Sequence, residues 1–358
     1  MRMTNVMDGR TVMGLVGIGR TALLPLPGIA ARGQVWLKAE YTNPFGSVKD
    51  RTAAYLLAWA REEGGPDVSV VESTSGNLGM ALANLGPRFG VHVTLVMDDS
   101  LPIERIEDVR RAGASVRVVH ECHDGLTLRE SRIAVARELG RQPRWLWLNQ
   151  YGNEAGVRAH EETTGPEIWA DLNGEVDAVV ASVGSGGTLC GIGAAMRRCS
   201  RSLRIVGVEP VGSTISGGVD GAYLPSGAGM RGMPETVARH RSLIDFFTKT
   251  PDRVAAAWAV HLMRRYGLEV GLTTGAAVAV AVMLAEEWNV RIAVIAPDRG
   301  HSFRPAIDLL AQNVPILGST ALIHLRRFGQ GVHQTANRAD LRPTPSGTKS
   351  GEPRGATP

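Results

Sequence analysis

The sequence predicts an α/β protein with two lobes, and three observations support this prediction. The chain has 358 residues, more than a single ordinary domain contains. Short apolar, β-branched segments alternate with longer amphipathic segments, as in the βαβ units that build parallel sheets. The 43 glycines follow no collagen-like period, so they are typical of loops in which the backbone approaches a ligand closely.

The expected strands and helices follow from this alternation. The apolar segments that we expect to be strands lie near Val35, Val68, Val93, Val116, Trp145, Val179, Val206 and Val294. Residues 51–61, 77–85 and 103–112 are expected to be helices. From about residue 329 the sequence is rich in Pro, Gly, Ser and Thr, which predicts that the tail, residues 326–358, is disordered.

Composition and charge disfavour several classes of protein. Lys and Arg number 39 and Asp and Glu 35, which leaves a formal net charge of +4, so we expect no concentrated basic surface for nucleic acid. Cys122, Cys190 and Cys199 lack CxxC spacing, and we expect neither a disulfide framework nor a metal site. We also expect no signal peptide and no membrane-spanning segment, which predicts a cytoplasmic protein.

The segment KAEYTNPFGSVKDRTA, residues 38–53, carries the first candidate for chemistry. Lys49 lies in the first turn of an expected helix or just before it. The positive end of a helix favours the neutral, nucleophilic form of a lysine, which can form a Schiff base. A lysine in this position can equally be an ordinary surface charge, so the segment indicates a function only together with other signals.

Two loops between an expected strand and an expected helix are candidate anion sites. In VESTSGNLGMALA, residues 71–83, free N–H groups at the helix start suit a carboxylate. In residues 177–193, a glycine-rich run suits a phosphate: Gly184, Ser185, Gly186, Gly187 and Thr188. This run lacks the lysine of a P-loop and the third glycine of the dinucleotide fingerprint. Helix capping and a structural glycine turn are the alternative interpretations of the two loops.

Together, the three segments predict pyridoxal phosphate (PLP) chemistry on an amino acid, which requires a lysine, a carboxylate loop and a cup for one phosphate. The motifs NPFGSVKDR, STSGNLG and GSGGT occur in the order and spacing of a known family. The chain resembles the cysteine synthase and cystathionine β-synthase family of fold-type II PLP enzymes over most of residues 14–318. This resemblance implies two three-layer α/β/α lobes with the cofactor in the cleft between them.

The resemblance implies domain boundaries and a role for each matched residue. The large domain, which binds the PLP phosphate, comprises residues 1–44 and 158–325, and residues 45–157 form a small mobile domain. Lys49 is the Schiff-base lysine, and Asn77 is the partner of the cofactor's 3′-oxygen. The glycine-rich run at 184–188 becomes the phosphate cup. The resemblance implies that four residues bind the substrate carboxylate: Thr74, Ser75, Gly76 and Gln150.

Two positions depart from the cysteine synthase pattern. Leu78 stands where that family usually has a threonine, and Asp298 stands where it has a serine opposite the pyridine nitrogen. An aspartate there would favour the protonated nitrogen. If Asp298 turns away toward Arg299, a threonine of the GLTTGAA segment, Thr273 or its neighbour, would supply a neutral hydrogen bond instead. Both arrangements stay open.

The motifs STSGNLG, NQYGNE and PDRG look most like the branch that makes N-(2-amino-2-carboxyethyl)-L-glutamate for 2,3-diaminopropionate in siderophores and peptide antibiotics. The resemblance implies β-replacement on O-phospho-L-serine through an aminoacrylate, with L-glutamate as nucleophile. An anionic substrate needs a cation, and Arg231, Arg158 and Arg299 are candidates. Cysteine synthesis with sulfide is the alternative reaction, followed by dehydratase-type elimination.

Other classes fit less well. A regulator without enzymatic activity would be expected to lose Lys49, and a nicotinamide-dependent dehydrogenase would need the missing dinucleotide fingerprint. The resemblance implies a homodimer whose other partners are small amino-acid substrates, with no nucleic acid and no membrane.

Overall fold

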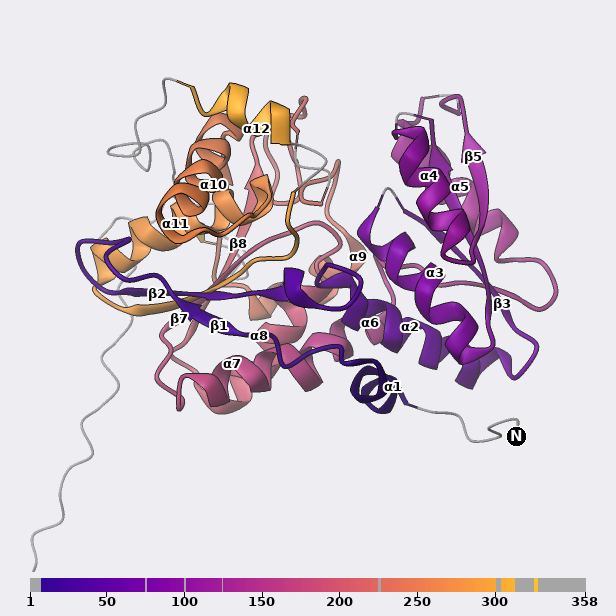
Figure 1. Cartoon of the computed structure of the whole chain (residues 1–358), viewed down its shortest axis with the longest axis horizontal. Coiled ribbons are helices and arrows are strands. Elements are labelled where there is room, and N and C mark those ends of the chain that lie inside the picture. Colours follow the sequence, from indigo (N-terminus) through magenta and orange to yellow (C-terminus); the bar gives the residue numbers. More distant parts are fainter. Residues whose placement is uncertain are drawn as a thin grey trace, which may run out of the picture.

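The strands of the protein form two separate sheets, one of seven strands and one of four (Figure 1). The computed structural model describes residues 8–74, 76–99, 101–123, 125–224, 227–300, 304–312 and 325–327. Ser75 and residues 328–358 of the expected tail lie outside these ranges. The two sheets, each with helices on both faces, confirm the predicted α/β fold with two lobes.

The larger sheet has a parallel centre and an antiparallel strand at each edge. In spatial order its strands are β1 (Leu23–Pro25), β2 (Gln34–Lys38), β10 (Arg291–Ile295), β7 (Ala178–Ser182), β8 (Arg204–Pro210), β9 (Phe246–Thr250) and β11 (Leu325–Arg327). The sequence patterns did not predict β1, β9 or β11. Because β11 pairs with β9, the first two residues of the expected tail belong to the sheet.

Helices cover both faces of the larger sheet because its central strands are apolar on both sides. Val180 and Val206 pack against one group of helices: α10 (Asp252–Tyr266), α11 (Leu272–Trp288) and α12 (Arg304–Leu310). Val179 and Ile205 point to the opposite face and pack against the other group: α7 (Gly165–Asp171), α8 (Gly187–Cys199) and α9 (Glu235–Arg239).

The smaller sheet is entirely parallel. Its strands, in spatial order, are β5 (Ser115–Val119), β4 (His92–Asp98), β3 (Ser69–Ser73) and β6 (Trp145–Trp147). One face packs against α2 (Lys49–Gly64), α3 (Asn77–Phe89) and α4 (Ile103–Arg111), and the other against α5 (Leu128–Leu139). Helix α6 (Glu154–Ala159) and a π-helical turn (His160–Thr164) lead back to the larger lobe.

The N-terminal helix α1 (Gly9–Val16) packs with the smaller lobe. Its apolar residues Val12 and Met13 join Tyr55 of α2 in the core beside the smaller sheet. The resemblance placed residues 1–44 in the large domain, and only the part that forms β1 and β2 joins the larger sheet. The apolar residues of α1 account for its position, because they pack against α2.

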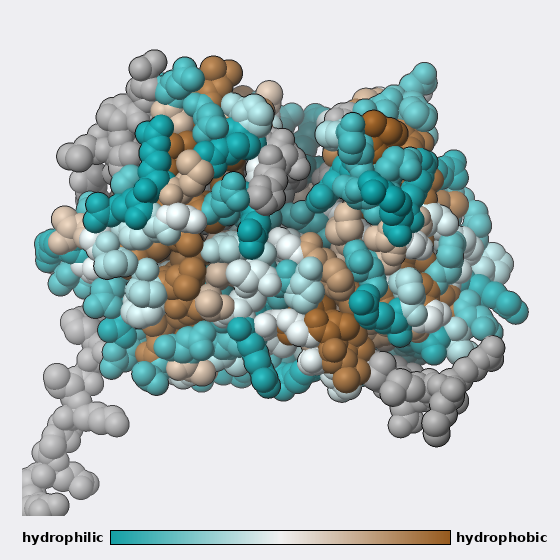
Figure 2. Space-filling view, in the orientation of Figure 1, coloured by the Kyte–Doolittle hydropathy of each residue, from teal (hydrophilic) through white to brown (hydrophobic). Residues whose placement is uncertain are grey.

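The molecular surface and the described helices indicate whether the protein could bind a membrane or a metal ion. Figure 2 shows a face on which hydrophilic residues interrupt the hydrophobic ones. Among the described residues, no helix is both long enough and apolar enough to cross a membrane. His120 and His123 have H-x-x-H spacing. Nevertheless, the residues that the structure describes include no group of three or more His, Cys, Asp and Glu residues that could bind a metal ion.

Candidate active site

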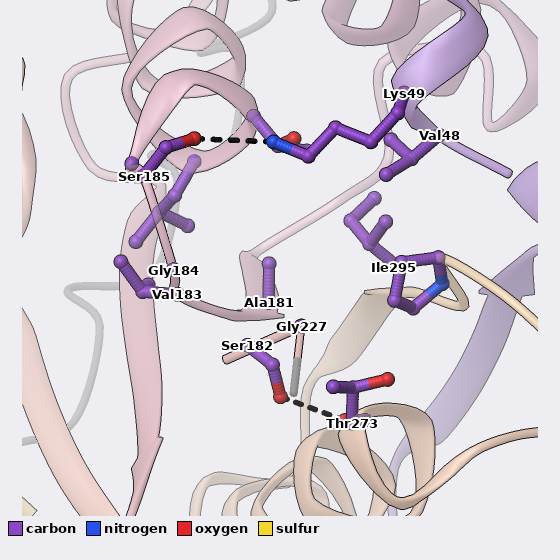
Figure 3. A pocket seen from close by; sticks show the side chains of 14 residues that line it. Val48, Lys49, Ala181, Ser182, Val183, Gly184, Ser185, Gly227, Thr273 and Ile295 are labelled. Atoms are coloured by element: carbon purple, nitrogen blue, oxygen red, sulfur yellow. Dashed lines mark hydrogen bonds between the residues drawn. The ribbon is translucent and has the colours of Figure 1, made fainter. Parts of the chain in front are cut away.

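The loops that carry the predicted motifs meet because each follows the carboxyl end of a parallel strand, the edge at which α/β proteins bind ligands. Thr74 follows β3, the run at 184–188 follows β7, and Asp298 follows β10. A pocket opens beside the run that follows β7, the end of β10 and the start of α2 (Figure 3). The residues that line it are Val48, Lys49, Ala181, Ser182, Val183, Gly184, Ser185, Gly186, Thr188, Leu189, Gly227, Thr273, Ile295 and Pro297.

Lys49 is the first residue of α2, and its side chain reaches across the pocket. Its Nζ donates a hydrogen bond to Ser185 Oγ at 3.2 Å (Figure 3). It donates a second one to Gln150 Oε1 at 3.3 Å. Burial lowers the pKa of Lys49 to about 8, although the nearby Glu72 carboxylate opposes this shift. At pH 7, roughly a tenth of the lysine is then neutral and nucleophilic.

Gln150 is fixed by contacts on three sides. Its backbone N–H donates to Glu72 Oε2 at 3.0 Å, and its Nε2 donates to the Ser73 carbonyl at 3.0 Å. These two bonds leave Oε1 facing Lys49. Burial raises the pKa of Glu72 to about 7. The sequence did not single out Glu72 or Ser73, although both directly precede the carboxylate loop.

The glycine-rich run forms a cradle that larger residues would fill. A Cβ atom on Gly184 would lie 2.6 Å from the Gly227 carbonyl oxygen, and Gly186 has a φ of +92°. The run ends at the N-terminus of α8, whose free N–H groups attract an anion. Thr188 at this end shares a hydrogen bond of 3.2 Å with the buried imidazole of His160. This arrangement fits a phosphate group.

Thr273 and Asp298, the two candidates for the pyridine nitrogen, have different surroundings. The Thr273 hydroxyl is buried without a hydrogen-bond partner, and Thr273 lines the pocket. Its carbonyl accepts a hydrogen bond of 2.7 Å from Ser182 Oγ (Figure 3). Asp298 is not among the lining residues, and its Oδ2 accepts from Asn77 Nδ2 at 2.9 Å. Thr273 therefore lines the pocket and has a buried hydroxyl without a hydrogen-bond partner, whereas the Asp298 carboxyl is already bonded.

The start of α3 is organised by Thr74 and Asn77. Thr74 Oγ1 accepts hydrogen bonds from the N–H groups of Gly76 and Gly79, both at 3.2 Å. The threonine side chain thus holds the loop in shape, as an ordinary helix cap does. Asn77 Oδ1 accepts from Arg105 at 3.1 Å. The sequence offered no signal for Arg105, because its proximity to Asn77 arises only when α4 packs beside α3.

The three arginines that we considered as partners of an anionic substrate do not line the pocket. Arg231 is more than half exposed, 3.8 Å from Asp220. Arg158 is exposed and forms a pair with Glu162, and Arg299 lies over the ring of Tyr41. Each of these side chains contacts an acidic or aromatic neighbour instead, and the sequence pattern did not reveal these contacts.

A buried ion network holds the first turn of α2. Arg51 bonds to Glu40 at 2.8 Å and to Glu167 of α7 at 2.6 Å. Lys38, at the end of β2, bonds to the same Glu167 at 3.0 Å. Arg51, Lys38 and Glu40 are fully buried. The network therefore fixes the helix start that carries Lys49 against residues of the larger lobe.

These features define a class of protein. A buried lysine of lowered pKa, a cradle for phosphate and a buried hydroxyl without a partner fit PLP, which supplies the electron sink for amino-acid chemistry. A model of the family described as "Pyridoxal-phosphate dependent enzyme" matches residues 15–298. The chain belongs to this family, and it is a PLP-dependent enzyme of the cysteine synthase type, the class whose reaction is β-replacement.

Individual relatives agree with this assignment. The chain is 34% identical to cysteine synthase A of Escherichia coli over 303 residues, which cover 80% of this chain and 91% of that protein. It is 34% identical to the N-(2-amino-2-carboxyethyl)-L-glutamate synthase of Cupriavidus metallidurans over 296 residues, 80% of this chain and 86% of that one. The cystathionine beta-synthase of Apis mellifera is 32% identical over 298 residues, 79% of this chain, and the match spans only 58% of that relative's length.

Solved structures share the fold. O-acetyl serine sulfhydrylase isoform 3 of Entamoeba histolytica superposes with a TM-score of 0.76 at 28% identity, covering 85% of this chain and 93% of that one. An O-ureido-L-serine synthase superposes with a TM-score of 0.75 at 29% identity, covering 83% and 95%. These likenesses confirm the fold-type II architecture that the motifs implied.

Proposed function

We propose that this enzyme catalyses β-replacement on O-phospho-L-serine with an amino-acid nucleophile such as L-glutamate. The product is then N-(2-amino-2-carboxyethyl)-L-glutamate, a source of 2,3-diaminopropionate for siderophore or peptide-antibiotic biosynthesis. The similarity to synthases of that name from Cupriavidus metallidurans and Ralstonia nicotianae supports the proposal, as do the motifs STSGNLG and NQYGNE.

The position of Arg129 is the observation that best supports anionic substrates. This partly buried residue of α5 donates to the Gly229 carbonyl at 2.8 Å, and Gly229 in turn donates to the carbonyl of Val183, directly before the phosphate cradle. In the part of the chain that the structure describes, no carboxylate forms an ion pair with Arg129. Arg129 does not line the pocket itself, but these two hydrogen bonds connect it to Val183, which does. A cation without an ion pair at this position suits a phosphate or a second carboxylate.

Two tyrosines extend this cationic region. Tyr223 is hydrogen-bonded to Arg129, whose charge opposes the rise in the pKa of Tyr223 that burial causes. The same guanidinium acts on the buried Tyr151, which directly follows Gln150. The charge of Arg129 therefore acts on the residue next to Gln150, while its side chain bonds to the loop at Gly229. An anion held here would contact both lobes.

Different residues of the chain accept the substrate proton, position the lysine and bind the substrate carboxylate. Bound PLP supplies the electron sink. Lys49 Nζ accepts the proton from the α-carbon of the substrate, and Ser185 and Gln150 hold that nitrogen in place. The N–H groups at the start of α3 bind the substrate carboxylate. Closure of the lobes over the substrate would exclude water and suppress hydrolytic side reactions.

Cysteine synthesis from O-acetylserine or O-phosphoserine and sulfide is the second candidate, since the identity to cysteine synthase A is equally high. Sulfide carries no carboxylate, so this reaction gives Arg129 a role only if the donor is phosphorylated. A dehydratase-type elimination would need no nucleophile and would release pyruvate.

The test offers the purified holoenzyme O-phospho-L-serine and O-acetyl-L-serine separately, each with glutamate, with sulfide and with neither. Products are identified by mass spectrometry, and pyruvate is assayed in parallel. We expect the glutamate adduct from O-phospho-L-serine. Cysteine formed from O-acetylserine and sulfide alone would overturn the choice of substrates and leave the family intact, whereas pyruvate without any adduct would indicate elimination.

We also propose that the enzyme is a homodimer, as the family resemblance implies. Light scattering coupled to size-exclusion chromatography measures the mass in solution. A mass of about one chain, 38.2 kDa, would contradict this part of the proposal.

A further inference from the structure

The side chain of Asn77 lies between two partners that come from distant parts of the sequence. Its Nδ2 donates to Asp298 Oδ2 at 2.9 Å, and its Oδ1 accepts from Arg105 Nη2 at 3.1 Å. Asp298 follows β10 of the larger lobe, while Arg105 belongs to α4 of the smaller one. The carboxamide is therefore bonded at both ends.

The two partners restrain the carboxamide differently. A guanidinium can only donate hydrogen bonds, so the atom of Asn77 that faces Arg105 must be the oxygen. A carboxyl group accepts when ionised and can donate when protonated, and burial raises the pKa of Asp298. Asp298 therefore tolerates either orientation of the amide, and Arg105 tolerates only one. Arg105 is the neighbour that determines which end of Asn77 points toward the larger lobe.

We propose that Arg105 is a positioning residue: it orients Asn77 so that the NH2 group, and not the carbonyl, is presented to the 3′-oxygen of PLP. The NH2 group has two hydrogens, and Asp298 accepts only one of them. The second hydrogen remains for the cofactor oxygen, which needs a donor. The inference uses the family's role for Asn77 and does not depend on which substrates the enzyme takes.

Arg105 also lies close to the carboxylate loop, which suggests a competing role. A Cβ atom on Gly76 would lie 3.5 Å from Arg105 Nη2. If the guanidinium bound the substrate carboxylate directly, its loss would weaken substrate binding and leave the cofactor unaffected. If it acts through Asn77, its loss changes the bound cofactor before any substrate is added. The two roles thus differ in a property of the resting holoenzyme.

The test compares Arg105→Gln with Arg105→Lys in the full-length protein. Glutamine keeps a polar contact but can donate or accept, so it removes the restraint on Asn77. Lysine, like arginine, can only donate. We expect Arg105→Gln to bind PLP about tenfold more weakly and to shift the visible absorbance of the bound cofactor, since a hydrogen bond to a charged oxygen is lost. Arg105→Lys should stay within about threefold of the wild type, because it retains a charged donor.

A matched control and a double-mutant cycle separate positioning from a general structural effect. Arg110→Gln alters an exposed arginine of the same helix, paired with Glu107, and should leave PLP affinity unchanged. In an Asn77→Ala background, Arg105→Gln should change PLP affinity by less than about twofold, because the residue through which it acts is gone. Full additivity in this cycle would overturn the proposal. So would a wild-type spectrum and PLP affinity in Arg105→Gln, with or without an increased KM for the amino-acid substrate.

Discussion

The ammonium nitrogen of Lys49 lies 3.2 Å from the hydroxyl oxygen of Ser185, so the first residue of α2 meets the loop that leads into α8. The two residues are separated by 136 positions in the sequence. Their contact joins the candidate base to the phosphate cradle. The chemistry of the pocket therefore depends on how the N-termini of these two helices are held together.

Replacing Lys49 with alanine should abolish turnover and the visible absorbance of covalently attached cofactor. The variant removes the amine that attaches PLP and accepts the substrate proton. Both properties are measured on purified protein after incubation with PLP, and circular dichroism checks folding. Turnover at the wild-type rate in a folded Lys49→Ala protein would refute the assigned role.

Covalent uptake of PLP by the cofactor-free protein should accelerate with rising pH, with a midpoint at about pH 8. The neutral amine is the reactive form, and burial places the pKa of Lys49 at about 8. Glu72→Gln removes the charge that opposes this lowering, so the midpoint should move to lower pH. Stopped-flow absorbance measures the rate. A midpoint that moves to higher pH in Glu72→Gln would contradict the electrostatic argument.

The unpaired hydroxyl of Thr273 predicts a specific pattern of variants. Thr273→Val should change the stability of the cofactor-free protein by less than about 1 kcal/mol, because the hydroxyl has no partner to lose. It should lower turnover about tenfold if that hydroxyl bonds the pyridine nitrogen. Asp298→Asn, which still accepts from Asn77, should have the smaller effect. The reverse order of effects would assign the nitrogen to Asp298.

The phosphate cradle should tolerate no side chain at Gly186. An added Cβ would lie 2.4 Å from Val237 Cγ2 and would sit at a φ of +92°. We expect Gly186→Ala to weaken PLP binding at least about tenfold. Gly232→Ala is the control, since Gly232 has a φ of +77° and an added Cβ there meets no atom within 4 Å. It should cost about 1–2 kcal/mol of stability and leave PLP affinity unchanged.

Arg129→Gln should raise the KM for glutamate about tenfold or more while sparing any reaction of O-acetyl-L-serine with sulfide, in which neither substrate carries a phosphate or a second carboxylate. The reason is the loss of the cation beside Gly229. Arg137→Gln on the same helix is the control, because that exposed arginine lies over Trp147 and not beside the pocket. Equal losses with glutamate and with sulfide would assign Arg129 to donor binding or to structure.

The sequence predicted the strands and loops well because each reactive motif directly follows an apolar strand. The glycines of the cradle and the lysine at the start of α2 are local signals of this kind. The pairing of Asn77 with Asp298 joins residues 221 positions apart, and no local pattern predicts it. The strands β1, β9 and β11 were missed because none of them is a continuous apolar segment: β1 ends in a proline, and the last residues of β9 and β11 are polar or charged. Arg129 was missed because a long side chain reaches its partner only after the lobes pack together.

The buried network around Arg51 has a consequence for how the enzyme can move. The body of α2 packs in the core of the smaller lobe, but its first turn is ion-paired to Glu40 and Glu167. Breaking a buried pair of this type costs about 3–5 kcal/mol, so separation of this turn from the larger lobe is strongly unfavourable. Lys49 is thus anchored to the half that cradles the phosphate, and we propose that the smaller lobe pivots about this turn. The distance from the base to the cofactor would stay constant while the carboxylate loop swings onto the substrate.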